Sequence, residues 1–258
     1  MKINQVFPAW PPGTVATTAF LQAQGVSPKL ARQYCASGWL EDVGHGAYIR
    51  HGERAGWPGA VYALQNHLGR DVHPGGRTAL QLHGLAHDLP LAARPVVDLY
   101  GPPGLRLPVW LREHDWQATL QYTGTGLFTQ ASATVQHPFG NFSLAVSTPE
   151  QAILEVLDGV PERDAFESAQ ALMEGLSTLR SKLMQSLLES CTSVKVKRLC
   201  LYLGDHLELP WRKRLDDSRV DLGTGKRQIV PGGKLDARYG ITVPKDTQRQ
   251  IREDRDHA

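Results

Sequence analysis

Residues 27–37 have the sequence Ser-Pro-Lys-Leu-Ala-Arg-Gln-Tyr-Cys-Ala-Ser, and this stretch predicts the helix that decides the fold. Ser27 is a good N-cap, Pro28 suits the first helical position, and Gly38 marks the end of the helix. At about 100° per residue, one arc of the helix is apolar and the opposite arc is mostly polar. The apolar arc holds Leu30, Ala31, Tyr34 and Cys35, and the opposite arc holds Lys29, Arg32, Gln33 and Ala36.

The segments on either side predict a helix-turn-helix followed by a hairpin. A helix is expected from Thr14, a candidate N-cap, to Gln24, and Gly25 ends it. After the second helix, two short apolar runs at 39–40 and 47–50 flank Gly44-His45-Gly46, which is the pattern of a β-hairpin. The order helix, glycine turn, helix and hairpin predicts a winged helix-turn-helix, whose second helix enters the major groove of DNA.

The polar arc of the second helix carries side chains that suit DNA. Two cations and an amide can contact guanine edges, adenine edges and phosphates. The hairpin adds groups that can reach the flanking backbone. The alternative is an ordinary amphipathic helix whose polar face meets only water. The candidate DNA contacts in this part of the chain are Ser27, Lys29, Arg32, Gln33, His45, Tyr48 and Arg50.

A second candidate surface follows from the distribution of charge. Residues 1–178 hold 11 Lys and Arg against 15 Asp and Glu, whereas residues 179–258 hold 17 against 11. A basic final third predicts a face that meets a polyanion, and the alternative is a solvated surface. The candidate phosphate contacts are Lys195, Lys197, Arg198, Arg212, Lys213, Arg214, Lys226 and Arg227.

Residues 221–227, Asp-Leu-Gly-Thr-Gly-Lys-Arg, look at first like a phosphate loop. The Walker pattern would need a glycine at position 220, where the chain has Val220, and no Ser or Thr follows Lys226 to hold magnesium. Two interpretations stay open. A glycine-rich turn can aim backbone N–H groups at a phosphate, or the segment is a plain structural turn.

The rest of the chain predicts a mixed α+β fold. Helices are expected at 58–68 and 76–85, and a domain boundary at 90–94 separates a winged-helix domain (1–93) from a C-terminal domain (94–250). The second domain has three strand-like runs, a capping box at Thr148-Pro149-Glu150-Gln151, and a basic tail after its helices. The expected strands are 96–100, 119–123 and 142–146, and the expected helices are 148–159, 164–176, 179–190 and 193–203.

Several classes of protein are disfavoured. No window has the roughly 18 apolar residues of a membrane span, and the first residues lack a signal peptide, so a cytoplasmic protein is expected. Cys35, Cys191 and Cys200 form no CxxC pair and are expected to be buried thiols. His83 and His87 lack a third ligand for a metal, so neither a metal nor a cofactor is expected.

Catalysis is likewise not expected. A nuclease would need clustered carboxylates around a metal ion, and Asp98, Asp205 and Glu208 lack a recognisable spacing. The sequence has no GxSxG motif and no dinucleotide fingerprint, and it assigns no catalytic residue.

Several short motifs resemble the AbiEi-type antitoxins of type IV toxin–antitoxin systems. They appear in the family's order, although little matches between residues 94 and 147. The motifs are Ser37-Gly38-Trp39-Leu40, Gly44-His45-Gly46-Ala47-Tyr48, residues 75–84 (GGRTALQLHG), Lys197-Arg198-Leu199, residues 221–227 (DLGTGKR), Gly232-Gly233-Lys234 and residues 239–244 (YGITVP).

The resemblance implies an N-terminal winged helix and a C-terminal antitoxin domain. It also implies a repressor that binds inverted repeats in double-stranded DNA upstream of its own operon and counteracts an AbiEii-like nucleotidyltransferase toxin. The toxin is a possible partner, and direct contact between the two proteins is left open. The leading hypothesis is therefore an antitoxin and autorepressor. The alternatives are a winged-helix regulator with a small-molecule sensor domain and no toxin, and a nuclease.

Overall fold

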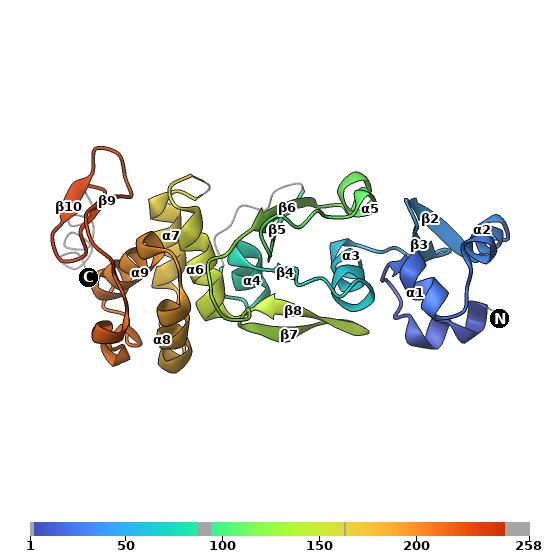
Figure 1. The fold of residues 1–258 in the computed structure, drawn as a ribbon, viewed down its shortest axis with the longest axis horizontal. Helices are drawn as coiled ribbons and strands as arrows, with labels where there is room; N and C mark the ends of the chain where they lie inside the picture. Colours follow the sequence, from blue (N-terminus) through green and yellow to red (C-terminus); the bar gives the residue numbers. More distant parts are fainter. Residues whose placement is uncertain (1–2, 87–93, 163, 246–258) are drawn as a thin grey trace, which may run out of the picture. The chain divides into compact units, whose positions relative to one another are not determined.

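The computed structural model describes residues 3–86, 94–162 and 164–245. The fold is α+β, as the sequence predicts, with small sheets and short helices (Figure 1). The chain divides into two compact units. The first comprises the described parts of residues 1–82, 88–125 and 134–147, and the second those of residues 83–87, 126–133 and 148–258.

The first unit begins with a winged helix. Its helices are α1 (Thr18–Ala23) and α2 (Pro28–Ala36), and its strands are β1 (Ala16–Thr17), β2 (Leu40–Gly44) and β3 (Ala47–Arg50). The strands form an antiparallel sheet in the order β1-β3-β2, with Ala16 opposite Tyr48 and Leu40 opposite Arg50. The predicted hairpin is therefore confirmed as the wing, and β1 is an additional strand.

The first helix is shorter than predicted. Thr17 caps it by accepting a hydrogen bond from the backbone N–H of Phe20 at 3.2 Å, so the expectation of a cap at Thr14 was wrong. The hydroxyl of Thr14 instead donates to the carbonyl oxygen of Pro11 at 2.7 Å. Ala16 and Thr17 are extended and form β1, because their backbones pair with β3.

A single apolar core joins the parts of the winged helix. Two 3₁₀ turns, Ile3–Gln5 and Phe7–Ala9, precede β1 in the sequence. Trp10, which follows the second turn, is fully buried. The indole N–H of Trp10 donates to the carbonyl of Thr14 at 3.0 Å, which satisfies its one polar group. The buried members of this core are Ile3, Val6, Trp10, Ala16, Leu21, Val26, Ala31, Leu40 and Tyr48.

The remainder of the first unit is a small α/β layer. It contains α3 (Trp57–Tyr62), a π-helical turn labelled η3 (Ala63–His67), β4 (His73–Pro74), α4 (Gly76–Leu82), β5 (Val96–Gly101), α5 (Val109–Glu113), β6 (Thr119–Gly124), β7 (Thr134–Phe139) and β8 (Phe142–Ser147). The sheet order is β4-β5-β6, with β5 and β6 parallel, and β7 pairs with β8 as a hairpin. The three expected strands are confirmed, whereas β4, β7 and α5 were missed.

Segments on both sides of residue 93 pack together in this unit. β4 pairs with β5, and α4 packs against β5. The side-chain amide of Gln65 extends the β8 edge, since it donates to the carbonyl of Ala145 at 2.9 Å and accepts from its N–H at 3.0 Å. A chain cut near residue 90 would therefore separate α3, β4 and α4 from the strands against which they pack, and the domain division at 93 stays a prediction.

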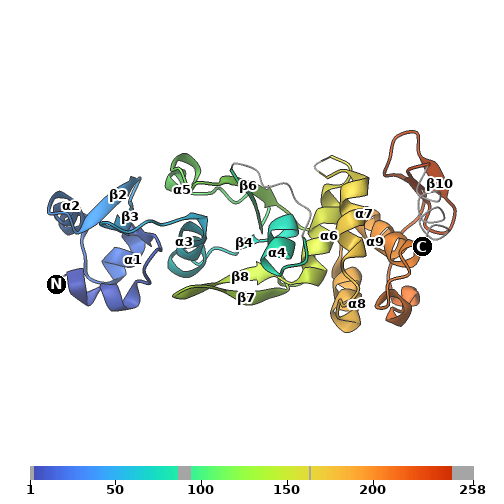
Figure 2. The same ribbon diagram turned by 180° about the vertical axis from the view of Figure 1, so that it is seen from behind.

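The second unit is built around four helices that lie side by side: α6 (Pro149–Gly159), α7 (Phe166–Glu174), α8 (Ser181–Ser190) and α9 (Val194–His206) (Figure 2). All four match expected helices, with small shifts at their ends. The predicted cap at Thr148 is confirmed, because its hydroxyl accepts from the N–H of Gln151. Glu150 in the first turn of α6 is 2% exposed and pairs with Arg180 at 2.9 Å.

The chain after α9 wraps back over the helices. It forms two 3₁₀ turns, η4 (Arg212–Arg214) and η5 (Asp217–Arg219), and the strands β9 (Arg227–Gln228), β10 (Lys234–Asp236) and β11 (Ile241–Val243). The strand order is β10-β11-β9, and β11 packs against α9. Cys191 and Cys200 are buried free thiols as expected, while Cys35 of α2 is only partly buried.

Candidate nucleic-acid interface

Helix α2 has the two-sided character that its sequence predicts. Ser27 caps it by accepting from the N–H of Leu30 at 3.3 Å, and Pro28 begins the first turn. Ala31 is buried in the winged-helix core, and the other apolar side chains pack against that core from partly exposed positions. On the opposite side, Lys29, Arg32 and Gln33 are exposed, and no hydrogen bond or ion pair joins their side chains to the described residues. The helix therefore exposes a row of three polar side chains that make no contact of this kind with the described residues.

The wing has a turn that favours glycine at two positions. Gly44, His45 and Gly46 have φ values of 102°, 50° and 80°, all in the left-handed region. A Cβ on Gly46 would lie 2.6 Å from the hydroxyl oxygen of Thr18, so that position has no room for a larger residue. The His45 side chain is 58% exposed at the wing tip, and its Nε2 lies 3.2 Å from a carboxylate oxygen of Glu113 in α5.

Two hairpin residues that were expected to contact DNA belong to the protein interior. Tyr48 is 6% exposed and is a member of the winged-helix core. Arg50 donates to the backbone carbonyls of Phe7 and Trp10, and its guanidinium lies 4.4 Å from the centre of the Phe7 ring. The expected DNA contacts at Tyr48 and Arg50 were wrong. The Tyr48 ring fills the core, and the Arg50 guanidinium joins the N-terminal turns to β3.

Four of the eight predicted C-terminal phosphate contacts are buried or bonded within the protein. Lys195 donates its ammonium to the carbonyls of Asp158 and Val160, at 2.8 and 2.6 Å, and Lys197 is 5% exposed. Arg198 and Arg212 are 5% and 6% exposed. The structure does not support the predicted phosphate contacts at these four cations, because their side chains are buried or bonded to internal acceptors.

Arg198 organises the glycine-rich segment that looked like a phosphate loop. Its guanidinium donates to the carbonyls of Leu222 at 2.8 Å, Gly223 at 3.1 Å and Gly225 at 2.5 Å. It also reaches the carbonyl of Gly240 at 3.4 Å. The loop therefore turns its carbonyl oxygens toward an internal cation, which supports the structural-turn interpretation over phosphate binding.

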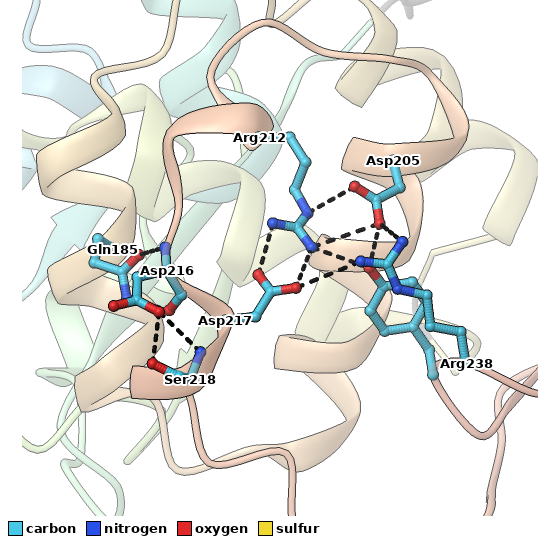
Figure 3. A network of polar contacts seen from close by, with 8 residues as sticks. Gln185, Asp205, Arg212, Asp216, Asp217, Ser218 and Arg238 are labelled. Atoms are coloured by element: carbon cyan, nitrogen blue, oxygen red, sulfur yellow. Dashed lines mark hydrogen bonds and ion pairs between the residues drawn. The ribbon is translucent and has the colours of Figure 1, made fainter.

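Arg212 is the centre of a second polar network (Figure 3). Its Nε lies 3.0 Å from Asp205, and its terminal nitrogens donate to both oxygens of Asp217 at 2.7 and 2.6 Å. Arg238 lies 2.8 Å from Asp205 and 3.6 Å from Asp217. The Tyr239 hydroxyl donates to Asp205 and accepts from Arg212. Burial, and then the hydrogen bond to Asp205, raises the pKa of Tyr239 to about 12, so the phenol stays protonated at neutral pH.

Four of the predicted C-terminal cations do face solvent. Lys213, Arg214, Lys226 and Arg227 are exposed, and no side-chain ion pair joins them to the described residues. They come from η4 and from the segment that leads into β9. All four belong to the second compact unit, so they form a candidate basic surface of that unit.

Other kinds of site find no support in the described part of the chain. No cluster of three or more His, Cys, Asp and Glu there could hold a metal ion. His83 is described, but its predicted partner His87 lies outside the described residues. Among the same residues, no helix combines the length and the apolar character that a membrane span requires.

Two families of known proteins match this chain. Residues 1–91 match the family described as transcriptional regulator, AbiEi antitoxin N-terminal domain. Residues 94–244 match the family described as transcriptional regulator, AbiEi antitoxin, type IV TA system. The chain belongs to the AbiEi antitoxin family.

A solved structure gives the fold of this AbiEi chain independent support. It is similar to the crystal structure of the RV2827C protein from Mycobacterium tuberculosis, with a TM-score of 0.55 and 16% sequence identity. The similarity covers 88% of this chain and 85% of that one, and at this identity it concerns the fold alone. A comparison with curated protein sequences returns no match.

Sequence reasoning missed the partners that hold the C-terminal part of the AbiEi chain together. Asp205, Asp217 and Tyr239 are separated from Arg212 by 7, 5 and 27 residues, so no local motif joins them. The only sequence signal for these long-range contacts was the set of short C-terminal motifs. Arg198 of the first C-terminal motif contacts carbonyls in the 221–227 motif and at Gly240 in the 239–244 motif.

Proposed function

We propose that this chain is an autorepressing antitoxin that inserts α2 into the major groove of inverted repeats upstream of its own operon. The observation that carries the proposal is the exposed row of Lys29, Arg32 and Gln33 on a helix whose other side is anchored in the core. Arg pairs well with guanine edges, Gln with adenine edges, and Lys with either guanine or phosphate. Membership of a family of transcriptional regulators supports the same conclusion.

The wing and the helix N-terminus complete the proposed DNA contact. In this proposal His45, which is exposed at the wing tip, contacts the sugar–phosphate backbone beside the groove. Ser27 is exposed and caps α2 by accepting from the N–H of Leu30, and Pro28 has no N–H, so a phosphate near the start of the helix would meet the Ser27 hydroxyl and the backbone N–H of Lys29. We assign Tyr48 and Arg50 to the domain interior and leave them out of the interface.

The C-terminal unit adds a non-specific contact in this proposal. Residues 1–55 carry only five Lys and Arg, of which Arg50 is internal, and this is few for tight binding at physiological salt. The four exposed cations at Lys213, Arg214, Lys226 and Arg227 would supply further phosphate contacts. Phosphate contacts position a protein but carry no sequence information.

Replacing these four cations by alanine should reduce the salt dependence of DNA binding. Each neutralised phosphate contributes about −0.9 to the slope of log K against log salt, so the slope should become shallower by roughly 2–4 units. The affinities for operator and random DNA should fall by similar factors. Binding titrations of the intact chain and the variant, from low to moderate salt, measure both effects. Parallel slopes would mean that this surface never meets the duplex.

The antitoxin part of the proposal rests on family membership. We assign the neutralising activity to residues 94–244, which match the antitoxin family, and the opposing toxin to the nucleotidyltransferase class. The protein acts in the cytoplasm in this account and carries out no catalytic step. Truncation is a poor test of the assignment, because β4 and α4 pack with β5 across the boundary.

A point variant separates the two roles more cleanly. Arg32→Ala should abolish most repression of the operon promoter, because it removes a base-reading side chain, yet it should still rescue cells from the toxin. The toxin and the antitoxin, or its Arg32→Ala variant, are expressed from promoters that the antitoxin cannot control. Cell growth measures rescue, and a reporter gene behind the operon promoter measures repression in the same cells. Loss of rescue at an unchanged antitoxin level would contradict the division of labour.

A further inference from the structure

A cavity of about 410 Å³ lies in the second compact unit, between α9 and the β10–β11 hairpin. This volume falls within the range of small-molecule sites, which is about 300–1,000 Å³. Three of its residues, Asp205, Arg238 and Tyr239, also belong to the network around Arg212 (Figure 3). Polar contacts in this network therefore hold three residues of the cavity wall in place.

One side of the cavity is aromatic and apolar. Tyr202 and His206 are four residues apart on α9, and their rings are parallel, with centroids 5.5 Å apart and an interplanar angle of 7°. The Tyr239 ring meets the Tyr202 ring edge-on at 6.3 Å. Leu235, Val243 and Pro244 add apolar lining. Such a surface suits a flat ring.

The other side of the cavity is cationic. Lys234 lies opposite Val243 in the β10–β11 register, and Lys245 follows Val243 by two residues. Both lysines are exposed and line the cavity, and no hydrogen bond or ion pair joins either ammonium to the described residues. Arg238 also lines the cavity, and its side chain is 64% exposed. Its guanidinium has five N–H donors, which is more than its contacts with Asp205 and Asp217 use.

The two acids of the cavity offset part of the charge of its three cations. Asp205 is already paired with Arg212, whose Nε lies 3.0 Å away, and its other oxygen accepts from Tyr239. The Asp236 carboxylate accepts from the backbone N–H of Tyr239 at 2.8 Å and keeps its negative charge, so the two acids and three cations that line the cavity leave it with a net charge of +1. Lys234 and Lys245 are therefore available to an anion that enters from solvent.

We propose that this cavity binds a nucleoside phosphate, with its base against the Tyr202 and His206 rings and its phosphates among Lys234, Arg238 and Lys245. An aromatic wall beside three cations matches a ligand that is flat at one end and multiply anionic at the other. The site is independent of the proposed operator contact at α2.

The test is calorimetric titration of the full chain with ADP, GDP, CDP and UDP. At least one diphosphate should bind in a 1:1 complex. The matching nucleoside and inorganic pyrophosphate should each bind at least about tenfold more weakly, since each lacks half of the contacts. The paired substitution Lys234→Ala with Lys245→Ala should weaken binding about 10- to 100-fold.

The matched control is Lys213→Ala with Arg214→Ala, which removes the same charge outside the cavity and should leave the affinity unchanged. Thermal unfolding checks that both variants are folded. Three outcomes would overturn the proposal: no diphosphate binds at millimolar concentration, pyrophosphate binds as tightly as the best diphosphate, or the control loses as much affinity as the cavity variant. None of these outcomes depends on operator binding, so a failure here leaves the DNA proposal standing.

Discussion

Arg212→Ala should lower the free energy of unfolding by about 3–5 kcal/mol, whereas Lys213→Ala, one residue along, should change it by less than about 0.5 kcal/mol. The two side chains stand next to each other in the run Arg212-Lys213-Arg214. Arg212 is 6% exposed and bound to Asp205 and Asp217, while Lys213 faces solvent. Removing the guanidinium would leave the partly buried carboxylates of Asp205 and Asp217 with the exposed Arg238 as their remaining cationic partner among the described residues.

Chemical denaturation measures this difference, and Arg212→Lys provides a second variant that keeps the charge. Lysine cannot reproduce the planar fork that bridges both carboxylates, so its stability should lie between those of Arg212→Ala and the parent. Because the chain has two compact units, the transition of the second unit must be resolved from that of the first. Equal losses for Arg212→Ala and Lys213→Ala would contradict the structural assignment of Arg212.

The second large effect is expected in DNA recognition. Arg32→Ala should weaken operator binding by about 1–3 kcal/mol and relax the preference at one base pair. The side chain is exposed on α2 and makes no internal bond among the described residues, so folding should not change. Arg54→Ala is the matched control, since Arg54 is an exposed cation of the same unit that lies outside α2.

Titrations on the operator and on a scrambled duplex separate base contacts from phosphate contacts. A loss confined to the operator supports base recognition by Arg32. An equal loss on both duplexes would make Arg32 a phosphate contact, and no loss on either would remove α2 from the groove. Arg54→Ala should have a small effect, and any loss it causes should be the same on both duplexes.

The parts of the fold that could be predicted have local causes. Ser27 and Thr148 cap their helices because a short polar side chain precedes Pro at the first helical position. The wing follows from glycines whose backbone takes positive φ. The split of α2 into a buried and an exposed side follows from the 3.6-residue period alone.

The errors concern partners that are distant in sequence. A run of Lys and Arg has the same appearance whether its charges meet solvent or acceptors of the same chain. Arg50 reaches carbonyls 40 and 43 residues away, and Arg198 reaches carbonyls 24 to 42 residues away. Gln65 likewise binds a strand edge 80 residues away. Composition therefore located the basic third correctly but could not divide it into internal and exposed cations.

The most direct test of the account is a footprint of the purified chain on the DNA upstream of its own gene. Two protected half-sites are expected in an inverted repeat, with centres about one helical turn of 10–10.5 base pairs, or a multiple of it, apart. Protection should be lost with Arg32→Ala and retained with Arg54→Ala. An unprotected upstream region, or an unchanged footprint with Arg32→Ala, would contradict the claim that α2 recognises this operator.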